Sequence, residues 1–100
     1  MALTPKQRAH LRSLAHHVKP IIYVGREGLT EATERSLVEG LAHRELIKLK
    51  VQESAPLTAR DAADLLPARI PGVEHVQTIG RTVVLYRRHP DRPEIELPGA

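Results

Sequence analysis

The sequence contains no cysteine, no tryptophan and no phenylalanine, and its only aromatic rings besides histidine are Tyr23 and Tyr86. Without cysteine, the chain can form neither disulfides nor thiolate metal sites. With so few rings, it lacks the several aromatic side chains on which RRM and OB-fold proteins stack bases. It also lacks the run of ~18 apolar residues that spans a bilayer and the apolar core of a signal peptide. We therefore expect a cytoplasmic protein without membrane association.

The length of 100 residues corresponds to one domain, and a hydrophobic content of 41% is sufficient for a core. We expect residues 1–88 to form this domain. Residues 89–100 contain Pro90, Pro93 and Pro98 among alternating charges. They are predicted to be an extended tail with partial order at Ile95 and Leu97.

Positive charge is concentrated near the N-terminus. The whole chain has 15 basic and 12 acidic residues, a net charge of only +3. Residues 1–26, however, contain no Asp or Glu, and a one-sided basic field attracts polyanions. The segment also contains His16, which could support the basic surface or pack beside the loop described next. Its cations are Lys6, Arg8, Arg12, Lys19 and Arg26.

The segment ends in a glycine-flanked loop, Gly25-Arg26-Glu27-Gly28, between an apolar run and a helix start at Thr30. Two glycines with this spacing allow a backbone to approach phosphate closely. The N-terminus of the following helix favours an anion, and Arg26 adds a bidentate donor. Loops of this form clamp nucleic-acid backbones in KH domains. Many ordinary turns share the spacing, but the loop and the basic segment together favour nucleic-acid binding.

The hydrophobic pattern predicts three helices and four strands. The first helix begins at Thr4 with a capping box and ends by Lys19, before Pro20. The apolar run at 21–24 is expected to be a central, buried strand. The helix after Thr30 should bury Leu37, Val38, Leu41 and Ala42.

Residues 46–51 alternate as a strand whose wet face carries Lys48 and Lys50. A third helix, capped at Thr58, should be cut short by Pro67. Strands at 73–79 and 82–86 follow, joined at Gly80-Arg81. The expected fold is a two-layer α/β sandwich of order α-β-α-β-α-β-β with a mixed four-stranded sheet.

Three residues have two interpretations each. Lys48 and Lys50 extend the basic surface or are ordinary solvent-facing residues. Tyr23 is interpreted first as a half-buried strand residue with its hydroxyl at the rim. Its position two residues before Gly25 also allows it to stack on a base. Tyr86 is interpreted as a half-buried structural residue.

Taken together, the motifs resemble the stand-alone bacterial CRM-domain proteins (chloroplast RNA splicing and ribosome maturation domain, also called YhbY-like). The similarity spans nearly the whole chain. The matching segments are Leu11-x-x-Leu14-Ala15-His16, Lys19-Pro20, Gly25-x-x-Gly28-Leu29-Thr30-Glu31, His43-x-Glu45-Leu46-Ile47-Lys48, Val76-Gln77-x-Ile79-Gly80-x-Thr82-x-x-Leu85-Tyr86-Arg87 and Ile95-x-Leu97-Pro98.

The resemblance implies an RNA-binding domain whose sheet is similar to that of the C-terminal domain of translation initiation factor three. It also implies a role with ribosomal RNA and precursors of the large ribosomal subunit. It assigns RNA contact to the Gly25–Gly28 loop, including Arg26 and Glu27, and to the adjoining basic surface. The alternative is a protein–protein adaptor of a ribonucleoprotein with little direct RNA contact.

The sequence gives little indication of catalysis. His16 and His17 are neighbours on a helix and point in different directions. There is no HExxH motif, no Walker loop and no dinucleotide fingerprint. We therefore expect a protein that is not an enzyme and that has no cofactor, no metal and no small-molecule substrate.

Overall fold

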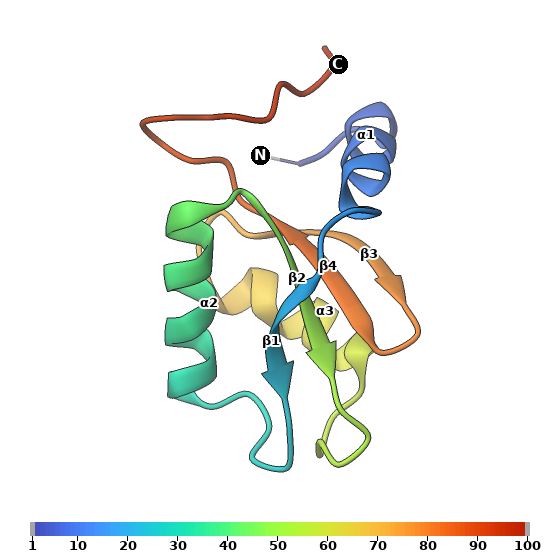
Figure 1. Cartoon of the computed structure of the whole chain (residues 1–100), viewed down its shortest axis with the longest axis vertical. Coiled ribbons are helices and arrows are strands. Elements are labelled where there is room, and N and C mark those ends of the chain that lie inside the picture. The colour runs from blue at the N-terminus through green and yellow to red at the C-terminus, as the bar shows by residue number, and fades with distance from the viewer. Residues whose placement is uncertain (1, 100) are drawn as a thin grey trace.

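The computed structural model describes residues 2–99, in which three helices flank a four-stranded mixed sheet (Figure 1). The outermost residues of the predicted domain and tail, 1 and 100, lie outside this range. The predicted order of elements is confirmed. In chain order the elements are α1 (Pro5–Ala15), β1 (Pro20–Val24), α2 (Glu31–His43), β2 (Leu46–Val51), α3 (Ala59–Arg69), β3 (Glu74–Ile79) and β4 (Thr82–Tyr86).

The strands lie in the order β1-β2-β4-β3. The helix α2 connects the parallel pair β1 and β2, and β4 is antiparallel to both β2 and β3. Each helix begins where the sequence predicted, because the hydroxyls of Thr4, Thr30 and Thr58 accept N–H groups of their own first turns. The capping boxes at Thr4 and Thr58 are complete.

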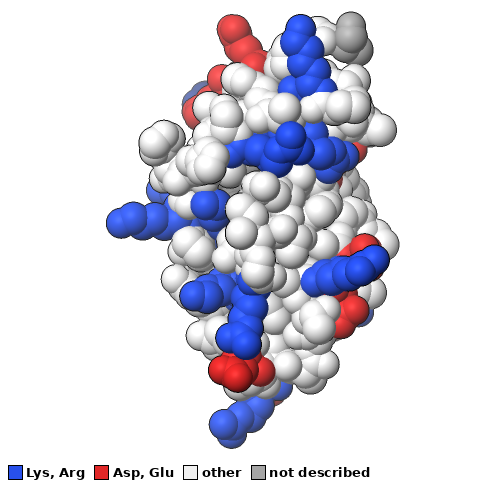
Figure 2. Space-filling view, turned by 90° about the vertical axis from the view of Figure 1, so that its right-hand side faces the viewer, with Lys and Arg blue, Asp and Glu red and all other residues white. Residues whose placement is uncertain are grey.

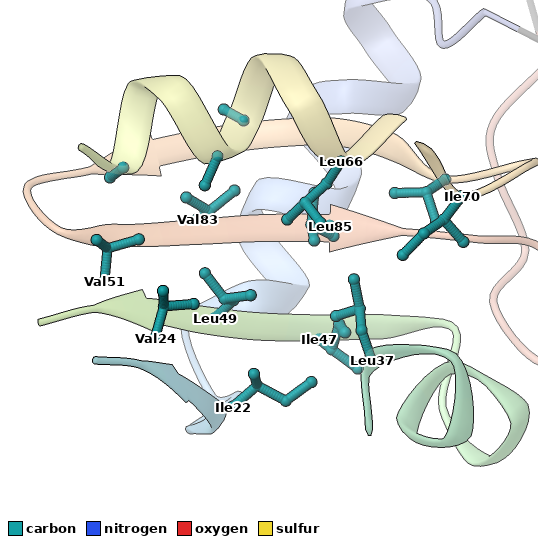
Figure 3. Packing of buried hydrophobic residues seen from close by; sticks show 14 of the residues in the cluster. Ile22, Val24, Leu37, Ile47, Leu49, Val51, Leu66, Ile70, Val83 and Leu85 are labelled. Carbon is teal, nitrogen blue, oxygen red and sulfur yellow. The ribbon is translucent and has the colours of Figure 1, made fainter. Parts of the chain in front are cut away.

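The main core lies between one face of the sheet and the helices α2 and α3 (Figure 3). Alternate residues of β1, β2 and β4 point into it, as the period-two pattern of a strand requires. Leu49, Val83 and Leu85 are fully buried at its centre. The other labelled members are Ile22, Val24, Leu37, Ile47, Val51, Leu66 and Ile70.

A second cluster occupies part of the opposite face, where α1 packs. Leu11 and Ala15 of α1 meet Leu46, Val84 and Tyr86 of the sheet. The chain after β4 runs back over this end, and Ile95 and Leu97 pack against the same cluster. Helix α1 therefore covers only one end of its sheet face.

Residues 89–99 have no regular secondary structure, but one buried carboxylate holds them in place. Glu45 is only 6% exposed. Its oxygens accept the backbone N–H groups of His89, Glu94 and Ile95 at 2.7–2.8 Å. A further hydrogen bond joins the Gln7 side chain to the Pro98 carbonyl at 3.1 Å. The C-terminal segment is therefore fastened to α1 and to the start of β2.

Three local predictions are wrong. The strand β1 lies at an edge of the sheet, and Ile21 and Tyr23 are exposed by 42% and 55%. In α2, Val38 is 42% exposed and Ala42 is also exposed, because only the stripe through Leu37 and Leu41 faces the sheet. A run of apolar letters cannot distinguish an edge strand from a central one.

The third wrong prediction is the end of α3, which continues through Pro67 to Arg69. Proline lacks the N–H that would bond within the helix. However, Leu66 and Ile70 on either side of it are buried in the main core, and the Ile70 N–H bonds to the Leu66 carbonyl at 2.9 Å. Packing on the sheet therefore outweighs the local preference to stop.

Candidate nucleic-acid interface

The Gly25–Gly28 loop is a tight turn closed by a hydrogen bond from the Gly28 N–H to the Gly25 carbonyl at 3.0 Å. Arg26 and Glu27 occupy its tip and are both exposed. Neither is in an ion pair within residues 2–99. Gly28 has a φ of 75°, which explains why glycine suits this position. The turn thus presents one cation and one anion to solvent, and its closing hydrogen bond uses the Gly28 N–H.

The turn rests on the β2–α3 loop. The Gln52 N–H donates to the Val24 carbonyl at 2.8 Å just before the turn. A side chain added at Gly28 would lie 3.1 Å from the Pro56 ring. The turn is therefore backed by a neighbouring loop and cannot fold inward.

The N-terminus of α2 is a weaker anion-binding site than the sequence suggested. The Thr30 hydroxyl already accepts the Thr33 N–H at 3.1 Å. Glu31 and Glu34 also lie in the first turn and complement the positive end of the helix dipole. Any phosphate at the turn would therefore depend mainly on Arg26 and the free backbone N–H groups at its tip.

The basic residues of α1 differ in direction and in what they contact. Arg8, Arg12 and His16 are spaced four residues apart and lie along one side of the helix, whereas Lys6 points elsewhere. The Arg8 guanidinium donates to the His75 carbonyl of β3. Burial, together with the nearby Arg8 charge, lowers the pKa of His75. Arg8 thus ties α1 to the sheet, while Lys6 and Arg12 are exposed.

The structure separates the two basic features that the sequence combined. Helix α1 lies at one end of the sheet, and the Gly25–Gly28 turn lies at the other end of β1 (Figure 1). His16 ends α1, and the exposed Lys19 precedes β1, so both belong to the α1 end. Lys48 and Lys50 lie between the two ends, because they pair with Pro20 and Tyr23 of β1.

Helix α1 packs on one face of the sheet, and the part of that face beyond α1 is uncovered. The half-buried position expected for both tyrosines is wrong, because Tyr23 is 55% exposed there and Tyr86 is only 2% exposed. The burial of Tyr86 agrees with its expected structural role. Ile79 is also 55% exposed. Alternation along β3 does not indicate this position, because the register shift between His75 and Gln77 changes the face on which the following residues lie.

The comparisons with known proteins agree with this architecture. Residues 3–87 match the CRS1/YhbY (CRM) domain. The chain belongs to this family. It is 41% identical over 96 residues to the probable RNA-binding protein YqeI of Bacillus subtilis, covering 96% of this chain and 99% of YqeI. It is 38% identical over 96 residues to a protein of Haemophilus influenzae named as an RNA-binding protein, covering 96% of this chain and 95% of that one.

A solved relative has the same fold. The solution structure of the hypothetical protein SAV1595 from Staphylococcus aureus superposes with a TM-score of 0.77 at 36% identity. The match covers 97% of this chain and all of that one. The CRM fold and the mixed sheet are thus confirmed.

Basic side chains are widely distributed on the side of this CRM domain that carries α1 and β3 (Figure 2). Lys and Arg occur along its length, separated by uncharged surface, with fewer Asp and Glu. Among residues 2–99, no group of three or more His, Cys, Asp or Glu is placed to hold a metal ion. No helix in the same range is long and apolar enough to cross a membrane.

Proposed function

We propose that this CRM domain binds RNA without catalysing a reaction, and that the Gly25–Gly28 turn is its principal phosphate contact. The observation that carries the proposal is the exposed Arg26 at the tip of a turn held rigid from behind by the β2–α3 loop. The planar guanidinium fork matches two phosphate oxygens, so Arg26 loses less conformational freedom for each hydrogen bond that it forms. The names of the relatives from Bacillus and Haemophilus support the same ligand.

The exposed cations of the α1 end provide a second contact region. Lys6, Arg12 and Lys19 are free of ion pairs within the described residues, and His16 lies in the same row as Arg12. Because this end is separated from the turn by the length of β1, about 17 Å for five residues, one RNA must extend along the sheet to touch both. Arg8 contributes chiefly by positioning α1.

We further propose ribosomal RNA in precursors of the large subunit as the target, acting in the cytoplasm where subunits assemble. The resemblance to CRM proteins supports this choice. The competing function is an adaptor that meets ribonucleoproteins through protein contacts. Phosphate binding releases counterions, so an RNA-binding protein should lose affinity with salt at a slope near −0.7 per phosphate on single strands, whereas an adaptor should bind RNA weakly at any ionic strength.

The deciding experiment compares Arg26→Ala with Arg35→Ala in binding to large-subunit ribosomal RNA fragments. Arg35 is an exposed arginine on α2, which covers the opposite face of the sheet. Loss of a direct charged contact should cost Arg26→Ala about 1.5–3 kcal/mol of binding free energy, and Arg35→Ala should bind like the parent. If the folded parent does not bind at low salt, RNA binding itself is refuted. If both variants bind like the parent, the turn is not the contact.

A further inference from the structure

Four residues form a row across the uncovered end of the sheet. The strand register pairs Tyr23 with Lys50, Lys50 with Thr82 and Thr82 with Ile79. Paired residues point to the same face, and the neighbours of Tyr23 in β1, Ile22 and Val24, belong to the core on the other face. The row therefore crosses all four strands on the side that carries α1.

No other part of the described chain packs over this row. Helix α1 covers Leu46, Val76 and Tyr86 at the far end of the same face. Tyr23 and Ile79, at the two ends of the row, are each 55% exposed, and Lys50 between them is exposed. The row thus exposes a tyrosine and an isoleucine with a lysine between them. It forms an amphipathic strip, whereas an ordinary solvent-facing sheet surface is mostly polar.

The charges of this strip suit a polyanion. The row contains Lys50 and no acidic residue, and Lys48 lies one step closer to α1 on the same strand. At the other end, β1 runs from Tyr23 through Val24 directly into the turn that carries Arg26. The nearest ion pair, Arg81 with Glu53 at 3.7 Å, belongs to the loops beyond the strand ends. The Tyr23 and Lys50 end of the strip thus lies between the α1 cations and the turn.

We propose that the row Tyr23–Lys50–Thr82–Ile79 binds unpaired bases of single-stranded RNA, with a base stacked on the Tyr23 ring and Lys50 contacting the adjacent phosphate. This inference rests on the proposed function and adds the structural class of the RNA. Three strand spacings of ~4.8 Å make the row about 14 Å wide. RRM sheets stack two or three bases on several aromatic rings, whereas this row has the single ring of Tyr23 and therefore stacks one base. Stacking tolerates any base, because every base has a flat π-face.

Affinity measurements on three variants test the stacking. The probe is a ten-nucleotide oligoadenylate, with a blunt RNA duplex of the same length for comparison. Tyr23→Phe keeps the ring and should bind the single strand like the parent. Tyr23→Leu should bind it about 5- to 150-fold more weakly, with little change for the duplex. Val38→Ala removes an apolar side chain of α2 that is also exposed, by 42%, and serves as the control.

Nuclear magnetic resonance supplies a direct readout, because Tyr23 and Tyr86 are the only tyrosines and the chain has no Phe or Trp. Adding oligoadenylate should move the Tyr23 ring protons upfield and leave those of buried Tyr86 in place. If RNA binds but the Tyr23 resonances stay fixed and Tyr23→Leu keeps full affinity, the inference is overturned and the proposed function survives. Tyr23 shifts that depend on protein concentration without RNA would also overturn it, since they indicate a second copy of the chain.

Discussion

Gly28 and Pro56 face each other across two loops, and the space between them is tight for any side chain on the glycine. A Cβ at Gly28 would lie 3.1 Å from Pro56 Cγ, and the φ of 75° is one that other residues seldom adopt. The contact fixes the Gly25–Gly28 turn against the β2–α3 loop. Gly28 therefore contributes to the fold itself. The stability of a Gly28 variant must be measured before its RNA affinity is interpreted.

Gly28→Ala should lower stability more than Gly80→Ala. Both positions have positive φ, but nothing lies within 4 Å of a Cβ at Gly80. Backbone strain should cost each variant roughly 1 kcal/mol or more, and only Gly28→Ala should add the clash with Pro56. In thermal melting, each kcal/mol corresponds to a fall of about 4–8 °C. Equal melting temperatures for the two variants would show that the loop contact has no energetic role.

Arg8→Ala should lower stability, whereas Arg12→Ala should weaken the salt dependence of RNA binding, although both remove a cation from α1. Arg8 donates to the His75 carbonyl, and such charged hydrogen bonds contribute about 1.5–3 kcal/mol to stability. Arg12 is exposed, so its loss should change stability by less than ~0.5 kcal/mol. Urea unfolding gives the stabilities. The RNA salt slope should flatten in Arg12→Ala by about one unit; an unchanged slope would mean that this side of α1 is merely solvated.

Glu45→Gln should loosen the C-terminal segment and weaken the pH dependence of stability. Burial alone would raise the Glu45 pKa, but hydrogen bonds from the His89, Ile95 and Glu94 N–H groups together lower it below its ordinary value of 4.5. A lowered pKa in the folded state stabilises the protein above the unfolded value, and this contribution disappears as pH falls through the folded value.

At pH 7 the Gln variant should therefore be less stable by about 1–3 kcal/mol, since an amide group cannot accept all three N–H groups. The difference from the parent should shrink below about pH 4.5. Chemical unfolding of both proteins between pH 7 and pH 3 measures it. Hydrogen exchange at Glu94 and Ile95 should accelerate in the variant, and unchanged protection there would contradict the anchoring role.

Pro67→Ala should stabilise the protein. Proline in the interior of a helix is about 3 kcal/mol less favourable than alanine. Pro67 lies only two residues before the last residue of α3, so we expect a smaller gain of about 1–2 kcal/mol. Thermal melting should show a higher midpoint with unchanged RNA binding. A lower midpoint would mean that the partly buried ring contributes packing that alanine cannot replace.

The features that the sequence determined are local ones. Thr4, Thr30 and Thr58 fix the helix starts, because a capping hydroxyl reaches N–H groups within its own turn. The alternation from Ile47 to Val51 fixes which side of β2 is wet, because strand side chains alternate by geometry. The closure of the Gly25–Gly28 turn is also local, because its hydrogen bond joins the first and last residues of the turn.

Only the tertiary structure decided features that depend on distant partners. Strand order placed β1 at an edge and exposed Tyr23, because the apolar run at Ile21–Val24 carries no information about which strands flank it. Packing against the sheet carried α3 through Pro67 against its local preference. The strip that crosses the sheet between α1 and the turn follows from the cross-strand register, which aligns Tyr23, Lys50 and Ile79 from three separate segments.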